Sequence, residues 1–139
     1  RIAMCYPHVY VASVNIGYNK EQYLKAIKEA SLHNGPSLII AYSPCIEHGI
    51  KTGMQHSQSN GYLATKCGYF LTFRYNPDTK KFSLDSKEPE FDKYEDYLMT
   101  ENRFASLVRK DKERARLLLE EQKQWAIDRY NYYKKISEE

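Results

Sequence analysis

Two apolar runs that flank one amphipathic segment constrain the fold of this chain more than any other feature. The runs HVYVASV at 8–14 and SLIIAY at 37–42 are rich in β-branched and aromatic residues, as buried strands are. The segment 20–33 places most of its apolar residues three or four positions apart and follows Asn19, a favourable helix N-cap. Strand, helix and strand in so short a stretch predict a βαβ unit with parallel strands.

The two strands and the helix also predict which surfaces are buried. Neither strand alternates polar with apolar residues, so we expect both to be covered on both faces. The helix should turn one stripe toward the sheet and leave Lys25, Lys28 and Glu29 in water. The predicted stripe consists of Tyr23, Leu24, Ile27, Ala30 and Leu32.

The rest of the chain predicts a third strand and a helical C-terminal part. A long polar connection at 43–60 is the kind that is usually functional or disordered. The further elements, in order, are a short helix at 59–66, a strand at 69–75, a turn at 76–78, an extended segment at 80–86, a charged linker at 86–94, a helix at 95–109, and a helix from the Asp111 cap to about 136. The last helix carries a stripe of Leu118, Leu119, Trp125, Ala126, Tyr130 and Tyr133. We therefore expect an α/β fold, a partial parallel sheet with a long helical extension, divided at 85/86.

Composition excludes several classes of protein. The formal charge of +3 comes from Lys and Arg that are interleaved with acidic residues, which does not call for a nucleic-acid partner. No apolar run approaches the ~20 residues that span a bilayer. Three irregularly spaced cysteines argue against a disulfide framework and favour a reducing, cytoplasmic setting. The 13 tyrosines are typical of an interface with one wet side.

Cys45 is the candidate functional residue. It follows Pro44 just past the second strand, and ligands of open α/β sheets bind outside the carboxyl ends of strands. The alternatives are a small buried side chain, a nucleophile, or one remote metal ligand, because no CxxC motif closes a local site. Cys5 and Cys67 are expected to be structural. The loop histidines His48 and His56 match no metal-ligand spacing. Asp85 could orient another group, although an Asp in a turn usually caps backbone N–H groups.

Five segments of the sequence together resemble a known family. They are VYVASVNIGYNKEQYLKAIKEA, GPSLIIAYSPCIEHGI, CGYFLTFRYNP, FSLDSKEP and EDYLMTENRFASL, in this order. From residue 1 to about 108 the chain resembles the C-terminal part of pyruvate:ferredoxin (flavodoxin) oxidoreductases, where the thiamine-diphosphate-binding domain ends and a C-terminal tail follows. The resemblance weakens over the last helix.

The resemblance implies a function. Enzymes of that family convert pyruvate and coenzyme A to acetyl-CoA and CO₂, using thiamine diphosphate and Mg²⁺. Electrons pass through [4Fe–4S] clusters to ferredoxin or flavodoxin, and the enzyme is a homodimer. By position, Cys45 corresponds to a ligand of the cluster nearest the thiamine, and thiolate ligation suits such clusters. Glu47 and His48 depart from the Asn-Gln or Asn-His pair typical of the family, which leaves fine tuning of the cluster open.

The resemblance also predicts what this stretch lacks. The GDG…N motif for Mg²⁺ and diphosphate is absent, and the chain begins almost inside a strand without an initiator Met. We therefore expect a fragment that alone is inactive, binds no cofactor firmly, and exposes apolar edges where further strands belong. The alternatives are a stand-alone Tyr-rich module that binds a protein or RNA, an enzyme for another 2-oxoacid, or residence in an anaerobic organelle such as a hydrogenosome.

Overall fold

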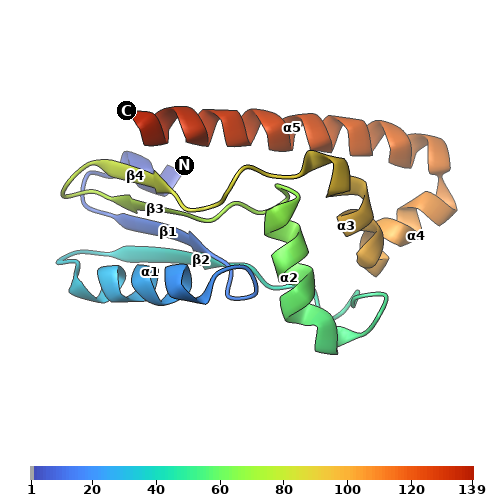
Figure 1. The fold of residues 1–139 in the computed structure, drawn as a ribbon, viewed down its shortest axis with the longest axis horizontal. Helices are drawn as coiled ribbons and strands as arrows, with labels where there is room; N and C mark the ends of the chain where they lie inside the picture. Colours follow the sequence, from blue (N-terminus) through green and yellow to red (C-terminus); the bar gives the residue numbers. More distant parts are fainter. Residues whose placement is uncertain (1) are drawn as a thin grey trace.

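The computed structural model describes residues 2–139 and contains a four-stranded sheet with helices on both faces (Figure 1). The strands lie in the order β2-β1-β3-β4. Their bounds are Tyr10–Val14 for β1, Ser37–Ala41 for β2, Phe73–Asn76 for β3 and Lys81–Leu84 for β4. The helix α1 (Lys20–Leu32) covers one face, and the long helix α5 (Lys112–Glu138) covers the other.

The βαβ unit is confirmed. β1 and β2 pair in parallel, with Val11 opposite Leu38, and α1 connects them. The Asn19 side chain accepts the N–H of Gln22 at 3.0 Å, which satisfies one of the unpaired donors in the first helical turn. β1 is buried along its whole length, as expected of a strand covered on both faces.

The prediction of a partial parallel sheet is wrong for the second half of the sheet. β3 runs antiparallel to β1, and β4 antiparallel to β3, so the sheet is mixed. The reason lies in α2 (Ser57–Lys66), which stands at the carboxyl end of β1 and β2 instead of crossing back over the sheet (Figure 1). The chain turns at Gly68, whose φ is 85°, and enters β3 from that same end. It can therefore only run back along β1.

The prediction that both faces of β2 are buried is also wrong. β2 is an edge strand, and its Leu38 and Ile40 side chains are 42% and 45% exposed. Leu24, at 66%, Ile27 and Leu32 of α1 are exposed as well, because α1 turns Gln22 and Ala26 to the sheet. Glu29, expected in water, is half-buried on that side. These side chains confirm the expectation that apolar edges stay uncovered in this chain.

The helix predicted at 95–109 is interrupted at Glu101. α3 (Tyr94–Thr100) and α4 (Asn102–Lys110) meet at this residue, whose ψ of 128° is extended. Glu101 forms an isolated antiparallel bridge with Ile50 in the polar connection, and that pairing replaces helical hydrogen bonds at this point. Short 3₁₀ turns lie at Ile2–Cys5, Met54–His56 and Phe91–Lys93.

The last helix begins at the predicted cap and buries part of the predicted stripe, namely Ala126, Tyr130 and Tyr133. The Asp111 side chain accepts the N–H of Arg114 at 3.0 Å. The buried residues of α5 are Ala115, Ala126, Tyr130 and Tyr133. Tyr133 packs on Phe73 of β3, with ring centroids 5.1 Å apart, whereas Trp125 is 60% exposed. The sheet thus selects the stripe that continues its aromatic face.

Within residues 2–139, no helix combines the length and the apolar character needed to cross a membrane. The division at 85/86 stays a prediction.

Candidate functional site

Cys45 lies in a tight turn just beyond β2. The N–H of Tyr42 still bonds to the Val14 carbonyl at 2.9 Å, so the strand ladder ends three residues before the cysteine. Pro44 is buried, and the N–H of Gly49 bonds back to the Cys45 carbonyl at 2.9 Å. Gly49 has a φ of 71°, a conformation that favours glycine. The turn therefore presents the partly exposed thiol at the carboxyl end of the parallel pair, as the sequence predicted.

The surroundings of Cys45 favour its thiolate. The main-chain N–H of His48, the His48 imidazole and the main-chain N–H of Glu47 lower the pKa of the thiol. The Cys45 Sγ and His48 Nδ1 atoms are 3.2 Å apart. A low pKa and partial exposure are the conditions under which a cysteine acts as a nucleophile or binds a metal. The sequence signal for this arrangement was a histidine three residues after the cysteine. The known spacings of metal ligands do not include this one, so sequence reasoning did not single it out.

The other cysteines differ from Cys45. Cys67 is 1% exposed and its Sγ lies 3.5 Å from the Ala64 carbonyl oxygen. Burial raises the pKa of this thiol to about 11, which confirms a structural role. Cys5 is exposed at the end of a 3₁₀ turn, so it is not packed in the core as Cys67 is. His56 ends a different 3₁₀ turn, and the imidazole beside the Cys45 sulfur belongs to His48.

Cys45 offers one metal ligand and not a complete set. Among residues 2–139, no three His, Cys, Asp or Glu side chains converge in a way that could hold a metal ion. A single thiolate that points out of a turn and faces two main-chain N–H groups does fit a cluster whose other ligands come from elsewhere.

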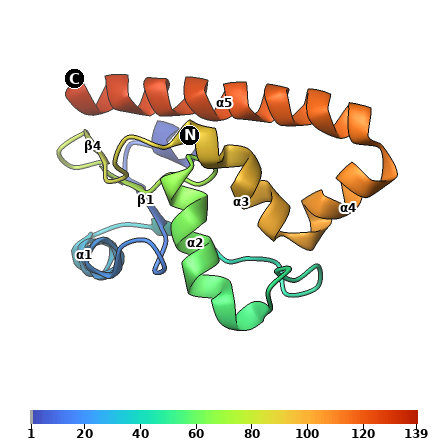
Figure 2. The ribbon, with the colours of Figure 1, turned by 45° about the vertical axis from the view of Figure 1, so that its right-hand side comes forward.

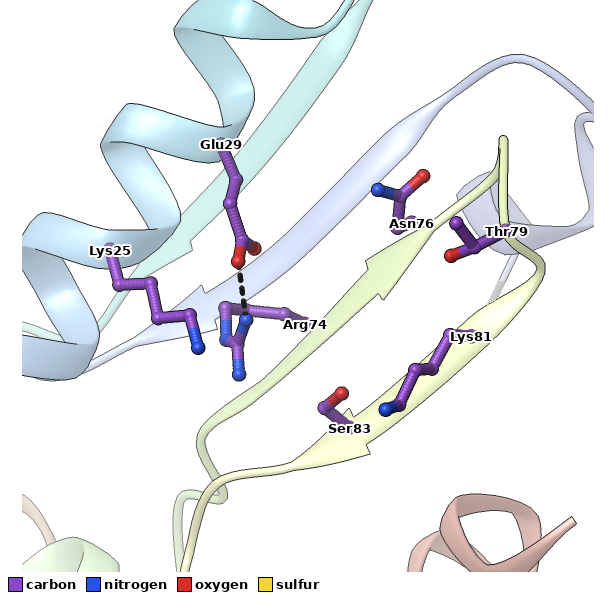
Figure 3. Close-up of a pocket in the computed structure, with 7 residues that line it drawn as sticks. All are labelled: Lys25, Glu29, Arg74, Asn76, Thr79, Lys81 and Ser83. Atoms are coloured by element: carbon purple, nitrogen blue, oxygen red, sulfur yellow. Dashed lines mark hydrogen bonds and ion pairs between the residues drawn. The ribbon is translucent and has the colours of Figure 1, made fainter.

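A second polar site lies under α1, around Arg74 of β3 (Figure 3). A cavity of about 270 Å³ opens here. Its lining consists of Lys25, Glu29, Arg74, Asn76, Thr79, Lys81 and Ser83. The Arg74 guanidinium bonds to Glu29 Oε1 at 2.7 Å and to both Asp85 carboxylate oxygens at 2.8 and 2.9 Å. The side chain that dominates the cavity is therefore already engaged within the protein.

The charges around Arg74 fix α1 to the sheet. Hydrogen bonds to Asp85, and then to Glu29, raise the pKa of Arg74 although burial opposes this. Burial acts to raise the pKa of Glu29, but hydrogen bonds from Arg74 and Tyr10 lower it overall. Asp85 also accepts a bond from Gln22 Nε2 at 2.9 Å, so it orients other side chains and the interpretation as a turn cap is wrong. The cluster adds to an apolar attachment of α1, in which Tyr23 and Ala30 of the expected stripe pack with Ala26 against β1.

A third, larger groove lies between α3, α4 and α5. Its volume is about 1010 Å³, and its floor is apolar. The floor includes Met99, Phe104, Leu107, Leu118 and Leu119. Charged residues such as Asp92, Glu95 and Lys112 also line it. Of the three places, the Cys45 turn has the chemistry of a functional site.

Comparison with known proteins gives this site a context. The chain is 42% identical over 141 residues to pyruvate-flavodoxin oxidoreductase of Enterobacter agglomerans, which covers 98% of the chain. It is 42% identical over 142 residues to pyruvate:ferredoxin oxidoreductase of Moorella thermoacetica, which covers 99%. The chain is homologous to one part of these oxidoreductases. It spans 12% of the length of each. No protein family profile matches the chain.

The same part occurs in enzymes with different electron acceptors. The NADP-dependent pyruvate dehydrogenase of Cryptosporidium parvum is 39% identical over 151 residues, which cover 99% of the chain and 8% of that protein. The names of these relatives share pyruvate and differ in ferredoxin, flavodoxin or NADP⁺. The matched region also includes the last helix, so a resemblance that ends near residue 108 was too short.

Proposed function

We propose that this chain is the C-terminal part of a pyruvate oxidoreductase, comprising the end of its thiamine-diphosphate-binding domain and a helical tail. The whole enzyme would oxidatively decarboxylate pyruvate with coenzyme A to acetyl-CoA and CO₂ and pass electrons to ferredoxin or flavodoxin. The supporting observation is homology of about 40% identity along nearly the whole chain to a small part of such enzymes. The fragment alone is proposed to be inactive and to bind no cofactor firmly.

Cys45 is proposed to be one thiolate ligand of a [4Fe–4S] cluster. Its low thiol pKa and its place beyond β2 support this role. The cluster, when bound, supplies one-electron transfer. The chain's own contribution is to hold the sulfur outward from a rigid turn and to direct the N–H groups of Glu47 and His48 at its negative charge.

The edge of the sheet is proposed to receive the preceding part of the same polypeptide. β2 has an unpaired edge, and Leu38 and Ile40 are exposed beside Leu24 of α1. An apolar edge strand is rarely left uncovered at the border of a folded domain, because its free edge can pair with further strands. A strand added to β2 would bring further ligands toward the carboxyl end of the sheet, where Cys45 lies. The enzyme would act as a homodimer in the cytoplasm.

The alternative of a stand-alone Tyr-rich module has no supporting observation. Tyr130 and Tyr133 of α5 are buried against the sheet. Tyr10, Tyr94 and Tyr97 are buried as well. The surplus of tyrosine thus serves the interior more than the surface.

Replacement of Cys45 in the full-length enzyme tests the proposal. Cys45→Ala should lower the iron content and remove or convert one cluster signal in low-temperature EPR spectra of the reduced enzyme. Cys67→Ala is the matched control, because it removes a thiol that is buried away from the turn. Unchanged iron content and EPR spectra in Cys45→Ala would refute the ligand role.

A further inference from the structure

The junction of α3 and α4 is hydrogen-bonded to the polypeptide just after Cys45. The Asn102 side-chain amide donates to the His48 carbonyl at 2.9 Å, and the Asn102 main-chain N–H donates to the Gly49 carbonyl at 3.2 Å. The N–H of Lys51 donates to the Thr100 carbonyl at 2.7 Å. Figure 2 shows this corner of the helices lying against the loop between β2 and α2. Two segments about 50 residues apart are therefore joined like a short piece of sheet.

The same junction is also hydrogen-bonded to the chain just before Cys45. The Tyr42 hydroxyl, directly after β2, donates to Glu101 Oε1 at 3.1 Å. The Tyr97 hydroxyl donates to the same oxygen at 2.7 Å, and Arg103 Nε donates to Glu101 Oε2. Glu101 thus receives donors from the exit of β2 and from both neighbouring helices.

The burial of Glu101 makes these hydrogen-bonded contacts rigid. The residue is 2% exposed, and a buried carboxylate persists only where hydrogen bonds and a counter-charge replace water. Thr100 is held in turn by Asn60 of α2, with Thr100 Oγ1 and Asn60 Oδ1 2.6 Å apart. A displacement of the Glu101 side chain would leave a buried carboxylate without its hydrogen-bond donors. The interruption of the helix at Glu101 is what brings its main chain to Ile50.

We propose that Glu101 and Asn102 are positioning residues for the Cys45 sulfur. They hold the turn from its two ends, at Tyr42 and at 48–51, and so fix the direction in which the thiolate points. The His48 carbonyl that Asn102 holds belongs to the residue whose N–H and imidazole face the sulfur. Loss of this bond therefore loosens the donors that stabilise the thiolate. The inference rests on the proposed function of Cys45 as a cluster ligand.

The test uses Asn102→Ala in the full-length enzyme. Replacing the buried charge of Glu101 threatens folding, whereas Asn102→Ala removes one partly exposed side-chain bond. Tyr42→Phe is the second variant, since it removes one donor to Glu101 and the hydrogen bond between the Tyr42 and Tyr97 hydroxyls, and keeps the ring. Asn131→Ala is the matched control, because Asn131 is exposed on α5, away from the turn.

Two measurements are made on each variant. Amide hydrogen exchange in the segment 45–51 should become roughly fivefold faster in Asn102→Ala, the loss expected for one hydrogen bond, and at least as much faster in Tyr42→Phe. The EPR line shape and midpoint potential of the cluster assigned to Cys45 should shift in both variants. Asn131→Ala should change neither.

The possible failures are distinguishable. If Cys45→Ala leaves every cluster intact, the proposed function fails and the positioning role fails with it. If Cys45→Ala removes a cluster but Asn102→Ala and Tyr42→Phe leave both exchange and EPR unchanged, only the positioning role is refuted. Faster exchange with an unchanged cluster would likewise refute it, because the junction would then stabilise the loop without directing the sulfur.

Discussion

Cys45 and Cys67 show how two regions of one chain give the same side chain opposite properties. Each follows a regular element, Cys45 after β2 and Cys67 at the end of α2. Cys67 packs among the apolar side chains of Ala64, Tyr94 and Leu98, and burial raises its pKa to about 11. Cys45 faces main-chain N–H groups and an imidazole, which lower its pKa. The dipoles and exposure around a thiol, and not its place after an element, decide whether it is reactive.

The largest expected difference is in thiol reactivity. In the 139-residue chain at neutral pH, iodoacetamide should alkylate Cys45 more than about 100-fold faster than Cys67, because two pKa units change the thiolate fraction about 100-fold. Peptide mass spectrometry over time measures both rates. In concentrated urea the rates should converge. Similar rates in the folded chain would show that the two environments do not differ.

The next effect is on stability at high pH. The pKa of Cys67 is about 11 in the folded chain and near 9 when unfolded, so the unfolded state loses its proton first. This contribution to stability is complete below pH 9. As the pH rises to 11 it is lost, and the free energy of unfolding falls by about 2 to 3 kcal/mol.

Urea unfolding of the chain and of Cys67→Ala between pH 8 and pH 11 measures this loss. The variant should lack the Cys67 contribution, while buried tyrosines, whose pKa values are also raised, contribute to both proteins. Cys45→Ala should retain the alkaline loss of the parent chain. If the free energy of unfolding fell equally with pH in the chain and in Cys67→Ala, burial would not be the cause of a raised Cys67 pKa.

The smallest effect is on packing at neutral pH. Cys67→Ala should destabilise the chain by about 1 kcal/mol, since it removes one buried sulfur atom from a packed cluster. Cys45→Ala should change stability by less than about 0.5 kcal/mol, because the thiol is partly exposed. Urea midpoints at pH 7 measure both. An equal loss in the two variants would mean that Cys45 also serves packing, contrary to the comparison.

Local sequence signals predicted the elements around Cys45 but not the contacts that hold them. The end of β2, Pro44 and the cysteine lie together in the sequence, so the position of Cys45 just beyond the strand was predictable. Glu101 lies in an otherwise helical pattern, and nothing local indicates an interruption there. Its partners Tyr42 and Ile50 are more than 50 residues away, and that pairing stabilises the extended conformation.

The sequence by itself determined the βαβ unit, the caps at Asn19 and Asp111, and the position of Cys45, because each depends on neighbours within a few residues. The tertiary structure decided the antiparallel course of β3, the polar attachment of α1 through Arg74, and the exposure of Leu118 and Trp125 in the stripe predicted for α5. These features depend on surfaces that meet only after the chain has folded. Periodicity shows that a helix has an apolar side but does not show which partner that side will meet.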